Sequence, residues 1–365
     1  MNTLILIGLI ALLLTYLESK KKLHNGMLMG FFLITVVVSL RFGYGNDYFG
    51  YLNHFQNNNT VNFKIEDLFN GVIRDPLWFL LNRLFGVLGF QWFVAALSII
   101  NSLAYYKLIK VSVPTKYWTF AFFVYFFSYS FFTMQLSMMR QALAMALIVF
   151  AVPLIIEKKI FAPSALLIAT IGIHSSSIVC IPFMLLMYFD FSRNKKLVVI
   201  SLVSLFLIFF FNKEIIKNII SSTITSSDIL YKYQDKYVLG SKYEASGAFS
   251  LFGYLLFFIP VLINIIYVVS KNADEKVIKY TLLFIFGSFI SLTNQIIPML
   301  GRVAWFFTIF SIVSIPIAYN NIRNKYIRVS FILLFILVTI REYYVFFHLE
   351  NWKDAFLEYR TIFNN

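Results

Sequence analysis

The residues best suited to chemistry are densest in the stretch 41–48, which reads RFGYGNDY. Asp47 could act as a general base toward a hydroxyl group or orient a sugar hydroxyl, and Tyr48 could stack on a sugar ring. The two glycines of this stretch would let the backbone turn sharply and approach a ligand. An ion pair between Arg41 and Asp47 that only staples the loop is the structural alternative.

Two further arginines are suited to binding an anion. Arg140, followed by Gln141, opens an alanine-rich apolar stretch, and a guanidinium at the N-terminal end of a helix is suited to binding phosphate. Arg302 follows Pro298 and Gly301, which interrupt a helix and free backbone groups that must line protein or water. Both are predicted to face a cavity. The alternatives are a snorkelling anchor for Arg140, and a helix-end anchor or the partner of an internal carboxylate for Arg302.

His174 lies in the sequence IHSSS, between two short apolar stretches. An imidazole titrates near neutrality, so this side chain could accept or donate a proton, while the serines could cap a helix. A hydrogen-bonded structural histidine is an equally supported alternative. The spacing assigns no Ser-His-Asp triad.

The elements that must position these residues are membrane spans. In 365 residues, 60% are hydrophobic and only 13% charged, whereas soluble domains carry about a quarter charged residues. Runs near 117–133, 138–156, 250–270 and 303–320 approach the roughly 20 residues that cross about 30 Å of hydrocarbon. The run 3–17 lacks a basic leader and a small-residue cleavage site, so it is predicted to be a span and not a signal peptide.

The net charge of +14 would suggest nucleic acid as the partner of a soluble protein, but here it is explained by basic loops between spans. Six basic clusters lie at 20–22, 107–116, 158–159, 193–196, 271–279 and 323–328. Placing all six in the cytoplasm predicts one all-α transmembrane domain over 1–365, with about twelve spans and both termini outside. The external loops fall near 42–76 and 212–249, and residues 77–88 form a re-entrant or interfacial helix.

This topology gathers ionisable side chains near the outer ends of spans. They are Arg41, Asp47, Arg74, Asp75, Arg140, His174, Arg302 and Arg341. An arginine at the bilayer centre costs about 2.5 to 3.5 kcal/mol on insertion scales, so several at one level indicate a shared anionic ligand. The serine- and tyrosine-rich loop 212–249 is suited to a lid or a sugar-contacting loop, with a solvated connector as the alternative.

Taken in order, these elements resemble the Wzy-type O-antigen and capsule polymerases and the EpsG-type exopolysaccharide family, over nearly the whole chain. The resemblance rests on five motifs: Arg41-x-x-x-Gly45-x-Asp47-Tyr48, Arg140-Gln141, His174-x-Ser176, Arg302 before Trp305-Phe306, and Tyr359-Arg360-Thr361. It implies a polymerase of the bacterial inner (plasma) membrane whose active site faces the periplasm or the cell exterior. The substrate implied is an oligosaccharide repeat carried on undecaprenyl pyrophosphate, and a GT-C-like membrane glycosyltransferase architecture is compatible with it.

The implied reaction is attack of an acceptor hydroxyl on the anomeric carbon of the donor, with departure of lipid pyrophosphate. Arg140 and Arg302 would stabilise the departing charge, and Asp47 or His174 would take the proton. The further candidates for substrate binding are Arg41, Tyr48, Arg74, Gln141 and Tyr359. No metal and no cofactor are expected, since arginine can replace a metal here and no carboxylate cluster indicates a divalent ion. The single cysteine, Cys180, allows neither a disulfide framework nor a zinc cluster.

The partners expected are the lipid-linked oligosaccharide and membrane lipids, with a chain-length regulator and a flippase as further candidates and no nucleic acid. Two other functions remain open. A flippase or transporter would also gather arginines around lipid pyrophosphate, but its polar groups would lie at the membrane midplane. A polysaccharide acyltransferase would use His174 as its base.

Overall fold

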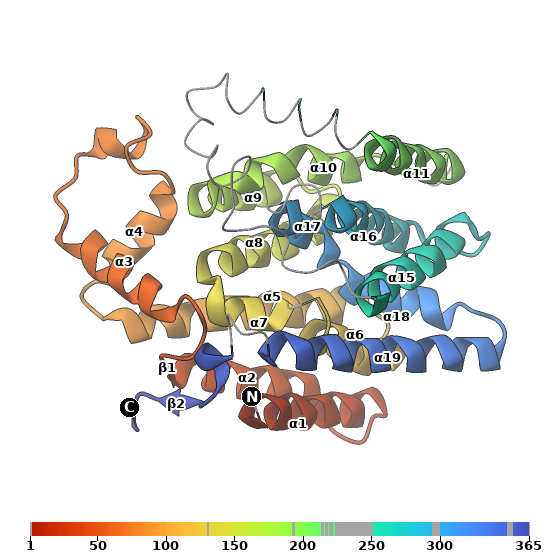
Figure 1. Ribbon diagram of the computed structural model, residues 1–365, viewed down its shortest axis with the longest axis horizontal. Coiled ribbons are helices and arrows are strands. Elements are labelled where there is room, and N and C mark those ends of the chain that lie inside the picture. The colour runs from red at the N-terminus through yellow and green to blue at the C-terminus, as the bar shows by residue number, and fades with distance from the viewer. Residues whose placement is uncertain are drawn as a thin grey trace. The chain divides into compact units, whose positions relative to one another are not determined.

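The computed structural model describes residues 2–129, 131–191, 194–212, 215, 218, 222, 251–293, 300–348 and 353–364. These residues are almost entirely helical, which confirms the all-α prediction in its coarse form (Figure 1). The chain divides into two compact units. Unit 1 comprises Met1–Tyr188 and Thr339–Asn365, and unit 2 comprises Phe189–Val338.

The elements of unit 1 follow one another along the chain with short connections. They are α1 (Asn2–Ser19), α2 (Gly26–Leu40), β1 (Arg41–Phe42), α3 (Tyr48–Thr60), η1 (Ile65–Leu68), α4 (Pro76–Leu84), α5 (Phe90–Ser112), η2 (Thr115–Tyr117), α6 (Trp118–Phe127), α7 (Phe131–Ser137), α8 (Met139–Ile156), α9 (Phe161–Ile173), η3 (Ser175–Cys180), α10 (Ile181–Leu185), η4 (Leu186–Tyr188), η6 (Asp354–Phe356) and β2 (Arg360–Thr361). The last part of α19 (Lys325–His348) also belongs to this unit.

Close helix packing builds the centre of unit 1. A Cβ atom on Gly26 would lie 2.2 Å from the Leu14 carbonyl oxygen, so only glycine allows α1 and α2 to approach this closely. Helix α6 is buried along nearly its whole length, and its Phe126 ring stacks on Phe132 of α7 with centroids 4.1 Å apart. Aromatic side chains therefore fill the space between helices at the centre of the unit.

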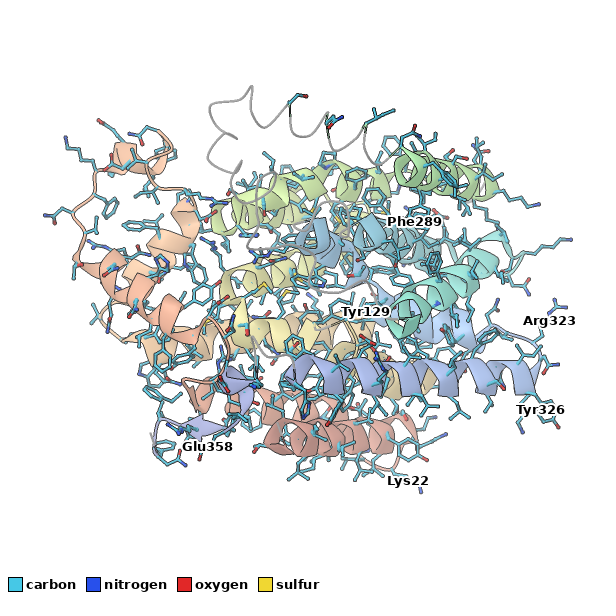
Figure 2. The ribbon with its side chains drawn as sticks, in the orientation of Figure 1. Lys22, Tyr129, Phe289, Arg323, Tyr326 and Glu358 are labelled. Atoms are coloured by element: carbon cyan, nitrogen blue, oxygen red, sulfur yellow. The ribbon has the colours of Figure 1, made fainter. Side chains whose placement is uncertain are left out.

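Unit 1 has two chemically different ends. At one end the Ser19 and Thr119 hydroxyls lie 3.2 Å apart, and the Lys107 ammonium lies 5.8 Å from the centre of the Phe150 ring. These contacts place the basic clusters 20–22, 107–116 and 158–159 at a single end. The strands β1 and β2, the helix α3 and the start of α8 lie at the other end, and Figure 2 labels Lys22 and Glu358 at the two ends.

Unit 2 is a second helical assembly. Its elements are α11 (Lys195–Phe211), α15 (Leu251–Val269), α16 (Glu275–Thr293), α17 (Leu300–Thr308), α18 (Ser311–Asn320) and the first part of α19. Helix α16 packs against α17, with the Phe286 and Phe307 rings edge to face at 5.0 Å. Asp274 begins α16 by accepting a hydrogen bond from the Val277 amide at 3.1 Å.

Four helical stretches among the described residues are long and apolar enough to cross a membrane: Phe90–Ser112, Met139–Ile156, Lys325–His348 and Thr115–Ser137, the last made of η2, α6 and α7 with the undescribed residue 130 between α6 and α7. A fifth is added if the pair Gly301–Thr308 and Ser311–Asn320, bent by 58°, is one broken span. The chain is therefore membrane-like, while the count of twelve spans stays a prediction. Helix α4 has nine residues and is about 14 Å long, too short to cross.

The first predicted external loop is more ordered than its polar sequence indicates. Residues 42–76 contain the 13-residue helix α3 and the 3-10 turn η1. The second predicted loop, 212–249, lies outside the described residues except for positions 212, 215, 218 and 222.

Candidate active site

A cavity of about 600 Å³ lies at the end of unit 1 opposite the basic clusters. Helix α3 forms one wall, with Asp47, Gly50, Tyr51, His54, Asn58 and Val61. The other side is formed by Val72, Ile73, Arg74, Asp75, Trp78 and Phe79, and by Arg140 at the start of α8. The cavity thus joins three separate stretches of the sequence.

The wall formed by α3 is a single helical face. Positions 47, 50, 51, 54, 58 and 61 follow the three- and four-residue spacing that places side chains in one stripe. Asp47 stands at the N-terminal boundary of this helix, and its carbonyl oxygen accepts the Tyr51 amide at 2.9 Å. Its side chain is exposed to the cavity, where it can meet a substrate.

The loop that carries Asp47 packs directly against the C-terminal end of α7. Gly45 has a φ of +116°, and a Cβ atom there would lie 2.1 Å from the Leu136 carbonyl oxygen, so no other residue fits. The Asn46 amide donates to the Ser137 hydroxyl at 3.1 Å. These contacts fix the position of the N-terminal end of α3 relative to the C-terminal end of α7.

A C-terminal segment, residues 353–364, closes over the same loop, and we call it the strap. Strand β2 pairs antiparallel with β1, Arg41 opposite Thr361. The Gly45 amide donates to the Ala355 carbonyl oxygen at 3.1 Å, and the Tyr359 hydroxyl donates to the Val37 carbonyl oxygen at 2.6 Å. Burial raises the pKa of Tyr359 to about 12, so the hydroxyl keeps its proton at neutral pH.

Three residues predicted to bind substrate lie in this supporting layer. Arg41 is 1% exposed and donates to the carbonyl oxygens of Val38 at 3.4 Å and Gln135 at 3.1 Å. Burial lowers the pKa of Arg41 to about 10, which leaves the guanidinium charged at neutral pH. Tyr48 is also buried, and its ring packs edge to face on Phe90, centroids 5.4 Å apart. With Tyr359 in the strap, these side chains position the loop and do not line the cavity.

On the side of the cavity opposite α3, an ion pair connects the segment before α4 to the start of α8. The Arg140 Nη1 atom lies 2.6 Å from Oδ2 of Asp75, and Oδ1 of Asp75 accepts the Ser175 amide at 2.8 Å. The Asp75 side chain is only 4% exposed, whereas that of Arg140 is 32% exposed. Asp75 therefore ties the segment before α4 to the start of α8 and to the break between α9 and η3.

Removing the charge of Asp75 tests this connection. We expect Asp75→Asn to lower the free energy of unfolding by about 1–3 kcal/mol, because a buried charged acceptor is lost and Arg140 loses its partner. Thermal unfolding of the purified protein in detergent measures the change. The matched control is Glu66→Gln, an exposed carboxylate in η1, which is expected to unfold like the parent protein. Equal stability of Asp75→Asn and parent would contradict the assignment.

The other predicted site residues divide by position. Arg74 is exposed and lines the cavity, and Gln141 is buried behind Arg140. His174 ends α9, with its amide 2.9 Å from the Thr170 carbonyl oxygen, and it is absent from the cavity lining. Arg302 is an exposed residue of α17 in unit 2, and residues 294–299 before it, with Pro298, lie outside the described residues.

Several residues of the cavity carry no sequence prediction, namely Tyr51, His54, Asn58 and Trp78, and Asp75 is predicted only as an ionisable residue near the outer end of a span. The helical spacing of the α3 residues could have indicated that they share one face. The polar composition of this segment indicates a loop instead, and for a loop the spacing has no such meaning. Among the residues that the structure describes, no three His, Cys, Asp or Glu side chains gather in a way that could hold a metal ion.

Comparison with known proteins gives one match. The family model described as the EpsG family matches residues 26–361, which include every residue of the cavity and both paired strands. No curated protein and no solved structure matches the chain.

Proposed function

This chain belongs to the EpsG family, and from that premise we propose that it is a membrane glycosyltransferase that polymerises lipid-linked oligosaccharide repeat units into an exopolysaccharide. The observation that carries the proposal is the cavity in which Asp47, Arg74 and Arg140 meet. A carboxylate and two guanidinium groups in one cavity can take a proton from a hydroxyl group and stabilise a departing phosphate.

The reaction proposed is a single displacement. An acceptor hydroxyl oxygen forms a bond to the anomeric carbon of the donor sugar, and the bond from that carbon to the pyrophosphate oxygen breaks. Asp47 accepts the hydroxyl proton, and the electron pair of the broken bond leaves with the lipid pyrophosphate. Asp47 is preferred over His174 as the base because Asp47 lines the cavity.

The guanidinium groups stabilise the leaving group. Arg140 uses Nη1 for Asp75, and its side chain is still 32% exposed where it lines the cavity, so part of the guanidinium remains accessible to phosphate oxygens. Arg74 adds a second cation on the same side of the cavity. Arg302 is also proposed to bind phosphate, on the sequence argument alone, and Arg302→Ala would then shorten the polymer.

The orientation proposed follows from charge. Basic loops favour the cytoplasmic side, and three basic clusters lie at the end of unit 1 opposite the cavity. The cavity then faces the periplasm or the cell exterior at headgroup depth, where the pyrophosphate of an undecaprenyl carrier would lie in a bacterial inner membrane. About twelve spans and a re-entrant or interfacial helix for residues 77–88 remain part of this proposal.

Reconstitution of the purified protein with lipid-linked repeat units separates this function from its rivals. Growth of polysaccharide chains in the proteoliposomes is the expected result. Transbilayer movement of the lipid without chain growth would indicate a flippase or transporter, and incorporation of acyl groups would indicate an acyltransferase. Addition of a chain-length regulator in the same system tests that partner.

A further inference from the structure

The face of α3 that lines the cavity changes in chemistry along its length. The charged groups of the cavity lining are Asp47 on α3, together with Arg74, Asp75 and Arg140 on the facing side. Beyond Asp47 the stripe on α3 continues with Gly50, Tyr51, His54, Asn58 and Val61. An imidazole, an amide and a phenol on one helical face offer hydrogen-bond donors and acceptors without a carboxylate, a lysine or an arginine.

The side of the cavity facing this stripe includes two aromatic residues of α4. Trp78 and Phe79 of α4 reach the cavity with a small part of their surface, since they are 5% and 6% exposed, and the Trp78 ring packs edge to face on Tyr51 with centroids 5.7 Å apart. A sugar ring carries hydroxyl groups on its edge and C–H groups on its faces. The amide and imidazole groups of the stripe suit the hydroxyl groups of an uncharged sugar, and the neighbouring aromatic edges suit its C–H groups.

The stripe is held rigid by residues outside the cavity. Arg83 of α4 donates from Nη1 to the carbonyl oxygens of Asn58, Asn59 and Val61 at 3.0, 3.0 and 3.1 Å. These bonds occupy backbone carbonyls at the C-terminal end of α3, and they leave the Asn58 side chain to the cavity. The Asn59 side chain reaches the Asn82 carbonyl oxygen at 3.2 Å and joins the two helices a second time. A binding wall that is fixed before the ligand arrives loses little entropy on binding.

The stripe is also long enough for more than one sugar ring. The eleven steps from Asp47 to Asn58 correspond to about 16 Å along the helix axis. Since Asp47 stands at one end, a saccharide lying along the stripe would present a hydroxyl group to that carboxylate. The arginines on the facing side would remain available to the phosphate of the donor.

We propose that the stripe formed by Tyr51, His54 and Asn58 binds the acceptor saccharide, and that His54 and Asn58 determine which uncharged sugars the protein accepts. This inference rests on the proposed function for the role of Asp47 as base. The binding surface itself depends only on the geometry of α3 and α4.

Calorimetric titration of the purified protein with an unlinked oligosaccharide tests the subsite without the polymerisation reaction. The probe is the oligosaccharide released by mild acid from the lipid-linked repeat units of the source cells, which carries neither lipid nor pyrophosphate. We expect His54→Ala and Asn58→Ala to weaken its binding at least fivefold each. Gln56→Ala and Asn53→Ala, exposed positions on other faces of the same helix, are expected to bind like the parent protein.

Each outcome separates the inference from the proposed function. If all four variants bind the probe as tightly as the parent protein, the subsite proposal is wrong. It is also wrong if the parent protein does not bind the probe at about 10 mM. Both conclusions hold even if the parent protein polymerises repeat units. Selective loss in the His54 and Asn58 variants supports the subsite even where the parent makes no polymer, in which case the proposed function fails alone.

Discussion

Arg140→Ala is expected to abolish long polysaccharide chains and to lower the rate of repeat-unit transfer by about 10²- to 10³-fold, the loss typical of removing one preorganised donor to developing negative charge. Single lipid-linked units should accumulate, because their synthesis does not use this cavity. Arg140→Lys keeps the positive charge but loses the planar fork that matches phosphate oxygens, so we expect an intermediate rate. Gel analysis measures the polymer length, and a proteoliposome assay measures the transfer rate.

A second variant separates chemistry from folding. Arg140→Ala also leaves the carboxylate of Asp75 without its ion-pair partner, which destabilises a buried charge. The double variant Asp75→Asn with Arg140→Ala removes that charge, and we expect its thermal stability to exceed that of Arg140→Ala while its transfer rate stays low. Normal chain lengths in the well-folded double variant would refute the role of Arg140.

Asp47→Asn is expected to reduce transfer by about 10²- to 10⁴-fold, the usual contribution of a general base. Because the side chain is exposed at the cavity, the variant should unfold at the temperature of the parent protein. Asp47→Glu retains a carboxylate and should recover part of the rate. His174→Ala is the informative comparison, since its position at the end of α9 predicts a smaller loss.

The two measurements together decide which residue is the base. A full transfer rate in Asp47→Asn, with loss in His174→Ala, would assign the proton to the imidazole. Glu66→Gln serves again as the control for loss of an exposed carboxylate in the same region. Measuring initial rates at saturating donor keeps a change in binding apart from a change in chemistry.

Much of the architecture was predictable because membranes impose strong rules. Composition predicted helices, and the basic clusters 20–22, 107–116 and 158–159 were expected on one side, which matches the single end of unit 1 where they lie. The sequence predicts that the RFGYGNDY stretch and Arg140 lie near one another, and Asp47 and Arg140 line the same cavity. These features follow from patterns that extend over tens of residues.

The remaining features of the site depend on tertiary contacts that a local sequence pattern cannot predict. Tyr359 was expected to bind substrate, yet its hydroxyl is occupied by a carbonyl oxygen 322 residues away in the chain. Asp75 was noticed only as an ionisable residue, because its partner Arg140 is 65 residues distant. The sequence of α3 indicates a loop because its asparagines are poor helix formers, but packing against α4 overrides that preference.

The pairing of β1 with β2 has a consequence for biosynthesis. The segment that carries Asp47 is synthesised early, but the strap that fixes it leaves the ribosome only after some three hundred further residues have been made and inserted. Closing so long a loop is slow relative to forming the local helix pairs. In a nascent chain the Asp47 loop therefore lacks the contacts of the strap until residues 353–364 have been synthesised, and the proposed active site is not supported before then.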